Sequence, residues 1–455
     1  MSKDSLTFKK FEIYSNDDES SSVDLRGGTP RIEYRESVFL PYVVVVCNIV
    51  DTGNAVLVDD RYVSVLEAIK CQGVEKVDFA IEDSLGNKIN LDGDDYHLRV
   101  AATSEISTSF KATTFKLSLV SSEAFDNLPT ENECRNAYGG KISDIVKSII
   151  KNNLKSTKET TNFDVTLDTF NQQGKSRKPF DMILDLQKIC VPESVQTDKG
   201  KTSKGHLAGY LFWQTSEGWN FKSLDNLFKF SGSYLKYIDN RGRAIKNYIE
   251  TKRADNNIPS GFTDKILHYR VHRTIDALRQ FETGAFGTLL ETWDPINCRY
   301  DKTNSVITTE EGNGIRAGKN LPNFGKYAGK ATKRIANKSK AKGQTVVYGD
   351  NIQQQVQKTD KENYSVDNVT QQALQNYKQK MNMSAEIVIP ADFSLHAGDL
   401  IYCEFQELSS GKTIRSSNNR DSGIYMIADL CHFGNRSKTF TGLHLVRDSY
   451  GVKNG

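Results

Sequence analysis

The sequence has no long apolar run. Its longest apolar stretch, residues 38–50, is interrupted by Pro41 and Asn48 and contains four consecutive valines. A stretch this short and this rich in β-branched residues does not fit a membrane-spanning helix and predicts a buried strand. The N-terminus leads into a polar, acidic stretch without the apolar core of a signal peptide. We expect neither membrane insertion nor secretion.

Cysteine is scarce and is never paired at metal-binding spacing. The sequence contains no Cys-x-x-Cys pair, and its seven cysteines stand at positions 47, 71, 134, 190, 298, 403 and 431. An odd number of scattered cysteines is typical of reduced, mostly buried thiols in a protein assembled in a cytoplasm.

The motifs of common enzymes are absent as well. The sequence contains no Gly-x-Ser-x-Gly elbow, no phosphate-binding loop and no dinucleotide-binding fingerprint. We therefore expect no enzyme, with no catalytic residue, no cofactor and no metal site. The many carboxylates leave open a pair of the kind that cleaves peptidoglycan. A cell-wall-cleaving enzyme is accordingly one alternative.

Five residues are candidates for metal binding or nucleophilic catalysis, and each also has a purely structural interpretation. His268 and His272 have the spacing of a helical zinc pair, but the flanking residues favour a strand and no Glu stands in the general-base position. Cys190, or Cys431 beside His432, could supply a nucleophile. Because neighbouring side chains on a strand point to opposite faces, buried structural thiols are the better interpretation.

Charge is nearly balanced, with 60 Lys and Arg against 57 Asp and Glu and a net charge of +3. This balance does not indicate nucleic-acid binding over the whole surface. Residues 316–342 are the exception, since they hold nine Lys or Arg and no acid. They predict a solvated loop, or contact with DNA phosphates or an acidic partner. A nucleic-acid-binding module that uses this stretch is a second alternative.

What the sequence does contain is a succession of β-type runs around a helical middle. Short strands separated by Gly and Asp turns are predicted from residue 32 to 120, and four more between 386 and 446. Apolar residues at helical spacing predict helices over 142–154 and 180–190. Residues 209–224 predict a β-hairpin. Further strands are predicted at 266–271 and 288–293, and further helices at 276–281 and 366–381.

Three stretches carry a resemblance to a known family. They are YGGKISDIVKSIIKNNL at 138–154; KPFDMILDLQKIC at 178–190 with GYLFWQTSEGWNFKSLDNLF at 209–228; and HAGDLIYCEF at 396–405 with SGIYMIADLCHFG at 422–434 and HLVRDSY at 444–450. In this order they resemble the central baseplate hub proteins of contractile-tailed bacteriophages, the T4-like myoviruses and their cyanophage relatives. LLETWDPIN at 289–297 is also similar.

The resemblance implies an α+β, mainly β chain, with two tail-tube-like antiparallel β-barrel domains joined by a mixed helical and β connecting domain. We expect an N-terminal tube-like barrel at 1–122 and a connecting α/β domain at 123–228. Residues 229–300 would continue the second barrel and the connecting region. Residues 301–365 would form a basic, flexible insertion, and residues 366–455 a helix and the C-terminal part of the second barrel.

The resemblance also implies a function without catalysis. Three subunits of this family form a ring that adapts the six-fold tail tube to the three-fold central spike, and DNA passes through the ring. The implied partners are two further copies of the chain, the central spike protein, the tail tube or tube-initiator protein, the baseplate wedge proteins and the tape measure protein. DNA would be met only in transit. The implied location is the virion tail baseplate, assembled in the host cytoplasm.

Overall fold

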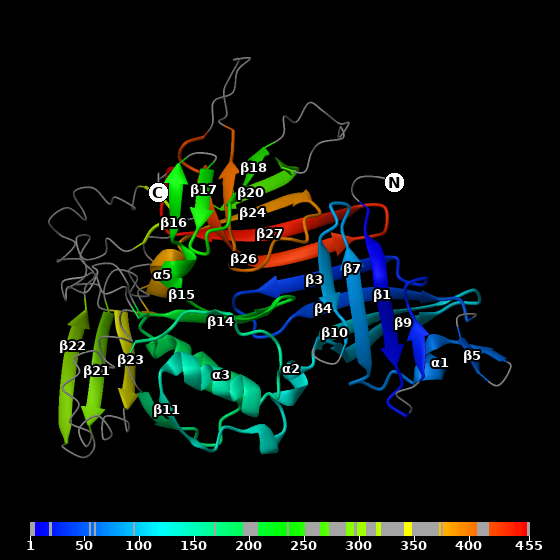
Figure 1. The fold of residues 1–455 in the computed structure, drawn as a ribbon, viewed down its shortest axis with the longest axis horizontal. Helices are drawn as coiled ribbons and strands as arrows, with labels where there is room; N and C mark the ends of the chain where they lie inside the picture. Colours follow the sequence, from blue (N-terminus) through cyan, green and yellow to red (C-terminus); the bar gives the residue numbers. More distant parts are fainter. Residues whose placement is uncertain are drawn as a thin grey trace.

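The structure is a computed structural model that describes residues 5–452, with gaps at 18–20, 54–55, 59–60, 94–95, 168–169, 194–207, 234–235, 251–263, 273–287, 295–297, 306–314, 320–340, 348–372, 375 and 407–417. The chain is mainly β, as the sequence predicts (Figure 1). Fifteen of the described strands belong to a single sheet.

The first part of the chain forms an antiparallel unit, here called the N-terminal β unit. Alternating buried and exposed side chains along β3 and β4 show the period of two that a sheet with one buried face requires. Its elements are β1 (Thr7–Tyr14), β2 (Ser22–Asp24), β3 (Arg31–Ser37), β4 (Val44–Asp51), β5 (Val56–Val58), β6 (Arg61–Val63), α1 (Val65–Ile69), β7 (Lys76–Glu82), β8 (Lys88–Leu91), β9 (Leu98–Thr108) and β10 (Thr113–Ser121).

A connecting region of short helices and strands follows. Its longest helix, α3, buries the apolar stripe that the sequence predicts, and α4 begins with a proline in its first turn, as predicted. Its elements are α2 (Glu123–Asp126), η1 (Thr130–Asn132), β11 (Ala137–Gly140), α3 (Ile142–Asn152), β12 (Asn162–Phe163), β13 (Phe170–Gln173), α4 (Pro179–Leu186), η2 (Gln187–Ile189), β14 (Tyr210–Thr215), β15 (Gly218–Ser223), α5 (Leu224–Leu227), β16 (Phe230–Ser233) and β17 (Lys236–Asp239).

The remaining strands include those of a second unit, here called the C-terminal β unit, which comprises β18–β20 and β24–β27. They are β18 (Lys246–Glu250), β19 (Lys265–Ile266), β20 (His268–His272), β24 (Met383–Pro390), β25 (Leu400–Glu404), β26 (Gly423–Gly434) and β27 (Thr439–Arg447). A separate three-stranded sheet contains β21 (Thr288–Asp294), β22 (Arg299–Ser305) and β23 (Ala341–Val347).

Strand β26 joins the two units. Its first residues pair with β25, and residues Asp429–Gly434 pair with β3 of the N-terminal β unit. Its other edge pairs with β27 along Met426–Gly434. Strands β25 and β3 therefore follow one another along the same edge of β26, and the sheet forks at this strand. In Figure 1, β26 and β27 lie beside β3 and β4, although nearly 400 residues separate them in the sequence.

The expectation of two separate closed barrels is not confirmed, since the described strands of both units form one large mixed sheet. The main path of the sheet runs from β19 through β18, β25, β26, β3, β4, β10, β9, β7 and β1 to β2, and β27, β24 and β20 branch from it at β26. The β3–β26 pairing occupies the edge of β3 that the N-terminal β unit would need in order to close on itself. Buried side chains of both units also merge into one apolar cluster, which contains Phe79 and Leu117 as well as Ile387 and Leu445. The domain boundaries stay a prediction.

Other local predictions have mixed outcomes. The hairpin over 209–224 is confirmed as β14 and β15, and the strands near 266–271 and 288–293 are confirmed as β19–β20 and β21. Of the helix predicted at 366–381, residues 373–374 and 376–380 are helical. The helix predicted at 276–281 and most of the basic segment 301–365 lie outside the described residues.

Candidate functional site

The β14–β15 hairpin is a wall between two apolar cores. All six residues of β14 are buried. Tyr210 and Phe212 face a cluster with α3 and α4, whereas Leu211 and Trp213 face a cluster with β25, β26 and β27. This follows from the alternation of side chains along a strand, since a strand buried on both faces needs an uninterrupted apolar run. The three stretches that carry the family resemblance therefore pack together through this hairpin.

The tip of the hairpin meets a charge cluster at the β3–β26 seam, here called the junction cluster: Glu36, His396 and Asp399, which are buried, and Glu217, which is largely exposed. The Nδ1 atom of His396 lies 3.2 Å from Oε1 of Glu36, and its Nε2 atom lies 3.5 Å from Oε1 of Glu217. The backbone amide of His396 donates to Asp399 at 3.1 Å. One imidazole thus connects strand β3, the hairpin turn and the segment before β25.

Glu36 receives hydrogen bonds from every side of the junction cluster. The Tyr34 hydroxyl donates to its Oε1 atom at 2.6 Å, and the backbone amides of Ser216 and Ala397 donate at 3.0 and 2.9 Å. Its side chain is fully buried. A buried carboxylate is tolerated only when it is paired and hydrogen-bonded in this way, so the site fixes the relative positions of three segments that are distant in the sequence.

The electrostatics of the junction cluster depend on the balance between burial and pairing. Burial acts to lower the pKa of His396, but the charge of Glu36 and hydrogen bonds to Glu217 and Glu36 outweigh it and hold the pKa well above its ordinary value. Burial acts to raise the pKa of Glu36, and the charge of His396 outweighs it, so that pKa lies below its ordinary value. Burial raises the pKa of Asp399 to about 6. Burial lowers the pKa of nearby His432 to about 3.

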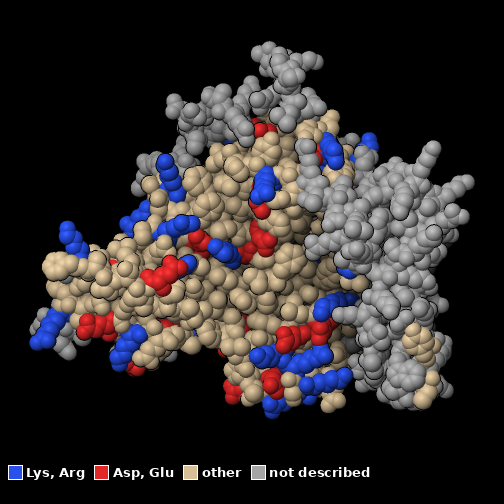
Figure 2. All heavy atoms as spheres, turned by 180° about the vertical axis from the view of Figure 1, so that it is seen from behind, with Lys and Arg blue, Asp and Glu red and all other residues tan. Residues whose placement is uncertain are grey.

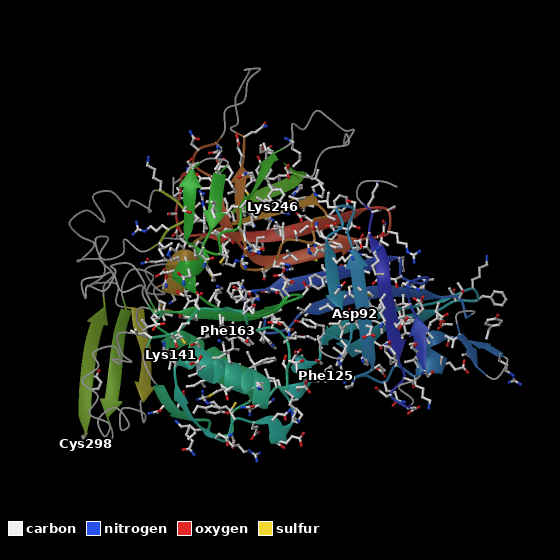
Figure 3. All side chains as sticks on the ribbon, in the orientation of Figure 1. Asp92, Phe125, Lys141, Phe163, Lys246 and Cys298 are labelled. Carbon is white, nitrogen blue, oxygen red and sulfur yellow. The ribbon has the colours of Figure 1, made fainter. Side chains whose placement is uncertain are left out.

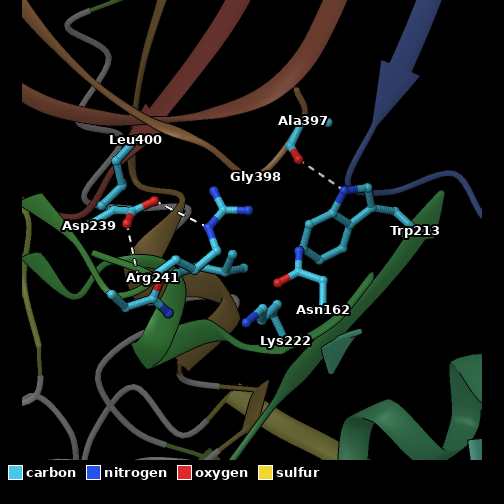
Figure 4. Close-up of a pocket in the computed structure, with 10 residues that line it drawn as sticks. Asn162, Trp213, Lys222, Asp239, Arg241, Ala397, Gly398 and Leu400 are labelled. Atoms are coloured by element: carbon cyan, nitrogen blue, oxygen red, sulfur yellow. Dashed lines mark hydrogen bonds and ion pairs between the residues drawn. The ribbon is translucent and has the colours of Figure 1, made fainter. Parts of the chain in front are cut away.

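Two arginines from the turn after β17 hold Asp399 from the other side. Arg241 and Arg243 each donate to its Oδ1 atom and also to Asp239. Figure 4 shows Arg241 beside Asp239 on one side of a small cavity of about 10 Å³, with the Trp213 indole on the opposite side donating to the Ala397 carbonyl. That hydrogen bond measures 3.0 Å.

A larger hollow of about 370 Å³ lies beside this small cavity. One wall is the hairpin, with Glu217, Trp219 and Lys222, and another is formed by Arg241 and Arg243. The positive charges that line it are already compensated, because Lys222 pairs with Asp164 at 3.1 Å and the arginines pair with Asp239 and Asp399. Among the described residues, no group of three His, Cys, Asp or Glu side chains converges to hold a metal ion.

The histidines considered from sequence lie apart from the junction cluster. His268 and His272 are on strand β20, not on a helix, and His272 lies 3.3 Å from Glu386 of β24. Because residues four apart on a strand are separated by about 13 Å, they cannot share one zinc ion.

The cysteines considered as nucleophiles lie in unreactive surroundings. Burial raises the pKa of the Cys190 and Cys431 thiols, which disfavours the reactive thiolate. None of the seven cysteines, all of which the structure describes, forms a disulfide bond, and most are buried. Cys298 is exposed and stands in the turn between β21 and β22, at the outer end of that ribbon (Figure 3).

The basic stretch at 316–342 can be followed only in part, since residues 320–340 lie outside the described residues. On the face drawn in Figure 2, the Lys and Arg side chains of the described residues are scattered, many of them next to Asp and Glu, and form no broad basic patch. None of the described helices is both long and apolar enough to cross a bilayer.

The sequence did not single out any residue of the junction cluster as functional. His396 and Asp399 stand within the stretch that carries the family resemblance, which was the available signal. Glu36 gave none, because it stands 360 residues from His396 and only the β3–β26 pairing brings the two together.

Comparison with known proteins gives distant structural likenesses. No family model and no curated protein sequence matches the chain. The 43 kDa tail protein of prophage MuSo2 from Shewanella oneidensis is similar, with a TM-score of 0.48 and 9% identity over 97% of this chain and 98% of that one. A tail protein from Neisseria meningitidis has a TM-score of 0.46 and 10% identity, over 96% of each chain.

A third similar structure is an Escherichia coli component of the type VI secretion system, described as structurally similar to bacteriophage T4 tail proteins. It has a TM-score of 0.36 and 8% identity, over 99% of this chain and 79% of that one.

Proposed function

We propose that the chain is a structural hub subunit of a contractile phage tail baseplate. Three copies would form a ring that adapts a six-fold tail tube to a three-fold central spike and lets DNA pass. The observation that carries this proposal is the β3–β26 pairing, which sets an antiparallel and a mixed β unit side by side in one chain. A subunit with two such units is what a three-fold ring needs in order to present six β units to a six-fold tube.

The packing of the resembling stretches supports the same proposal. Helices α3 and α4, the hairpin and strands β25–β27 are distant in the sequence, yet the hairpin contacts both groups through its two faces. These elements pack together as one structural unit of the chain. The family resemblance, and with it the spike, tube, wedge and tape measure proteins as partners, therefore rests on residues that lie together in space.

The proposal is tested by the mass and shape of the purified protein. Light scattering should give about 150 kDa, three times the 51.1 kDa chain, either alone or after addition of a spike protein. Negative-stain images should then show a three-fold ring with a central hole. A chain that stays monomeric at micromolar concentration, with and without the spike, would overturn the proposal.

A peptidoglycan assay separates the hub from the enzymatic alternative. The hub releases no soluble fragments from purified peptidoglycan at any pH from about 4 to about 8, the range in which carboxylate pairs act. Turnover that survives further purification of the protein would favour the cell-wall-cleaving enzyme instead.

A further inference from the structure

The hairpin tip is held at the β3–β26 seam mainly by polar contacts. The Glu217 carboxylate faces Nε2 of His396 at 3.5 Å, and the Ser216 amide donates to Glu36 at 3.0 Å. The Glu217 side chain itself is 68% exposed. The apolar side chains of the hairpin begin only at Trp213 and Trp219, on either side of the turn. The tip therefore depends on the charge of the groups beneath it.

The His396 ring has a carboxylate on each of its nitrogens. A neutral imidazole carries one N–H and one lone pair, so one of its nitrogens would point a lone pair at a carboxylate oxygen. Only the doubly protonated ring can donate to Glu36 and Glu217 together. The geometry of the cluster therefore requires an imidazolium. A single proton on His396 decides whether the ring attracts or repels the Glu217 carboxylate.

The other charged and titratable groups around the ring do not take over the role of the His396 proton in holding Glu217. Asp399, on the same segment, is held by Arg241 and Arg243, and so its charge is compensated from the far side. His432 of β26 stacks on Tyr34, and burial lowers its pKa to about 3, so it stays neutral. The Tyr34 hydroxyl donates to Glu36 and keeps its proton.

We propose that His396 is a proton-operated latch that holds the β14–β15 hairpin tip closed over the seam between the two β units. With the proton bound, the imidazolium holds Glu217 and the tip is shut. When the proton leaves, Glu217 is repelled by the lone pair, the tip lifts and the adjacent hollow of about 370 Å³ opens toward it. The latch belongs to the single chain, so it stands whether or not the chain assembles into a ring.

The direction of the pH dependence follows from the raised pKa of His396. A histidine whose pKa is higher in the folded than in the unfolded chain stabilises the fold fully below about pH 6.5, and this contribution is lost as the pH rises through the folded value. Glu36 has a lowered pKa and stays charged throughout that range. The latch is therefore closed below about pH 6.5 and opens as the pH rises through the raised pKa of His396.

Hydrogen–deuterium exchange of the hairpin tip tests the latch on the full chain. The Ser216 amide, which donates to Glu36, reports directly on closure. After division by the intrinsic rate at each pH, exchange in a peptide covering residues 214–219 should rise at least about tenfold between pH 6 and pH 10, since each pKa unit is a tenfold preference. Exchange in strand β10 should show no such step.

Three variants make the test specific. In H396Q the tip should exchange fast at every pH, with no step. In E217Q, which changes a largely exposed side chain and leaves the fold intact, the step should move to lower pH because one carboxylate is gone. The control H444Q removes a histidine paired with Asp429 on the outer face of β27 and should keep the wild-type step.

Either of two results would overturn the latch. One is a wild-type tip whose corrected exchange is the same across the whole pH range. The other is a step that keeps its midpoint in E217Q, which would assign it to another group even if H396Q failed to fold.

Discussion

At the scale of single residues, the approach of the segment before β25 to the hairpin depends on Gly398. This residue has φ of +90°, and a Cβ atom built on it would collide with the Trp213 indole. Its amide donates to the Ile427 carbonyl at 2.8 Å, which ties the segment to β26. The absent side chain is therefore what lets the Trp213 N–H reach the Ala397 carbonyl.

Replacing Gly398 should accordingly cost more than backbone strain alone. We expect Gly398→Ala to lower the free energy of unfolding by about 2–4 kcal/mol, because the new side chain would both strain a left-handed backbone and overpack against Trp213. The measurement is the midpoint of urea unfolding, followed by tryptophan fluorescence. Gly242→Ala is the matched control, because Gly242 has φ of +79° with no atom within 4 Å of its Cβ position. Equal costs for the two variants would contradict the collision.

The sequence indicated that this stretch matters, but not which of its side chains interact. The family resemblance covers His396 to Asp399, which lie in the segment before β25. The pairing with Glu36 could not be predicted, since local patterns carry no information about which distant strand supplies a partner. His268 and His272 show the converse. Their spacing suggested chemistry, whereas their strand conformation separates them.

At the scale of elements, a second buried ion pair ties the connecting region together. Lys158, in the segment after α3, lies 2.8 Å from Glu123 of α2, and both side chains are almost fully buried. Ser156 donates to Glu123 at 2.7 Å and accepts from the Trp219 indole of β15 at 3.0 Å. One carboxylate thus links α2, the segment after α3 and the hairpin.

Removing that carboxylate should leave Lys158 as a buried, unpaired charge. We expect Glu123→Gln to cost about 3–5 kcal/mol of unfolding free energy at neutral pH. Burial acts to raise the pKa of Glu123, but the Lys158 charge and hydrogen bonds from Lys158 and Ser156 outweigh it and lower that pKa. The contribution is therefore complete above about pH 4.3 and is lost as the pH falls through the lowered folded value.

Chemical unfolding at a series of pH values measures this dependence. The difference between wild type and Glu123→Gln should be constant near neutrality and shrink in acid. Glu131→Gln is the control, since Glu131 and Lys155 are 3.8 Å apart and mostly exposed, and such pairs contribute about 0–1 kcal/mol. A difference that persists unchanged in strong acid would show that the pair is not its source.

The hairpin shows which elements the sequence could predict. Its continuous apolar run and its turn indicated two adjacent strands, and β14 and β15 confirm them. Helix α3 was equally clear, because one apolar stripe at helical spacing has few other solutions. What the pattern could not tell is that the hairpin is buried on both faces by different partners.

At the scale of the whole molecule, the joining of the two β units departs from the sequence expectation. Two β-rich regions of similar size suggested two barrels with separate cores. The structure instead divides one edge of β26 between β25 and β3, and a single apolar cluster extends through both units. Two strands nearly 400 residues apart carry no local signal of their pairing. The hydrophobic pattern of the sequence therefore could not predict that β3 pairs with β26.

A shared core predicts that the two units lose stability together. Phe79 of β7 is fully buried and packs edge-on against Phe11 at 5.4 Å between ring centroids. We expect Phe79→Ala to lower the free energy of unfolding by about 3–5 kcal/mol. Because the cluster is continuous, the loss should be felt equally at Leu117 of β10 and at Leu445 of β27.

Hydrogen exchange of the slowest amides in β10 and β27 measures the two losses separately. Equal acceleration in both strands is the expected result, because residues in one cooperative unit open with the global free energy. Ile106→Ser is the control, since Ile106 is 57% exposed and surface changes of this kind stay within about 0.5 kcal/mol. Acceleration confined to β10 would mean that the two units unfold separately, as two independent barrels would. The β3–β26 pairing would then join the units without coupling their stability.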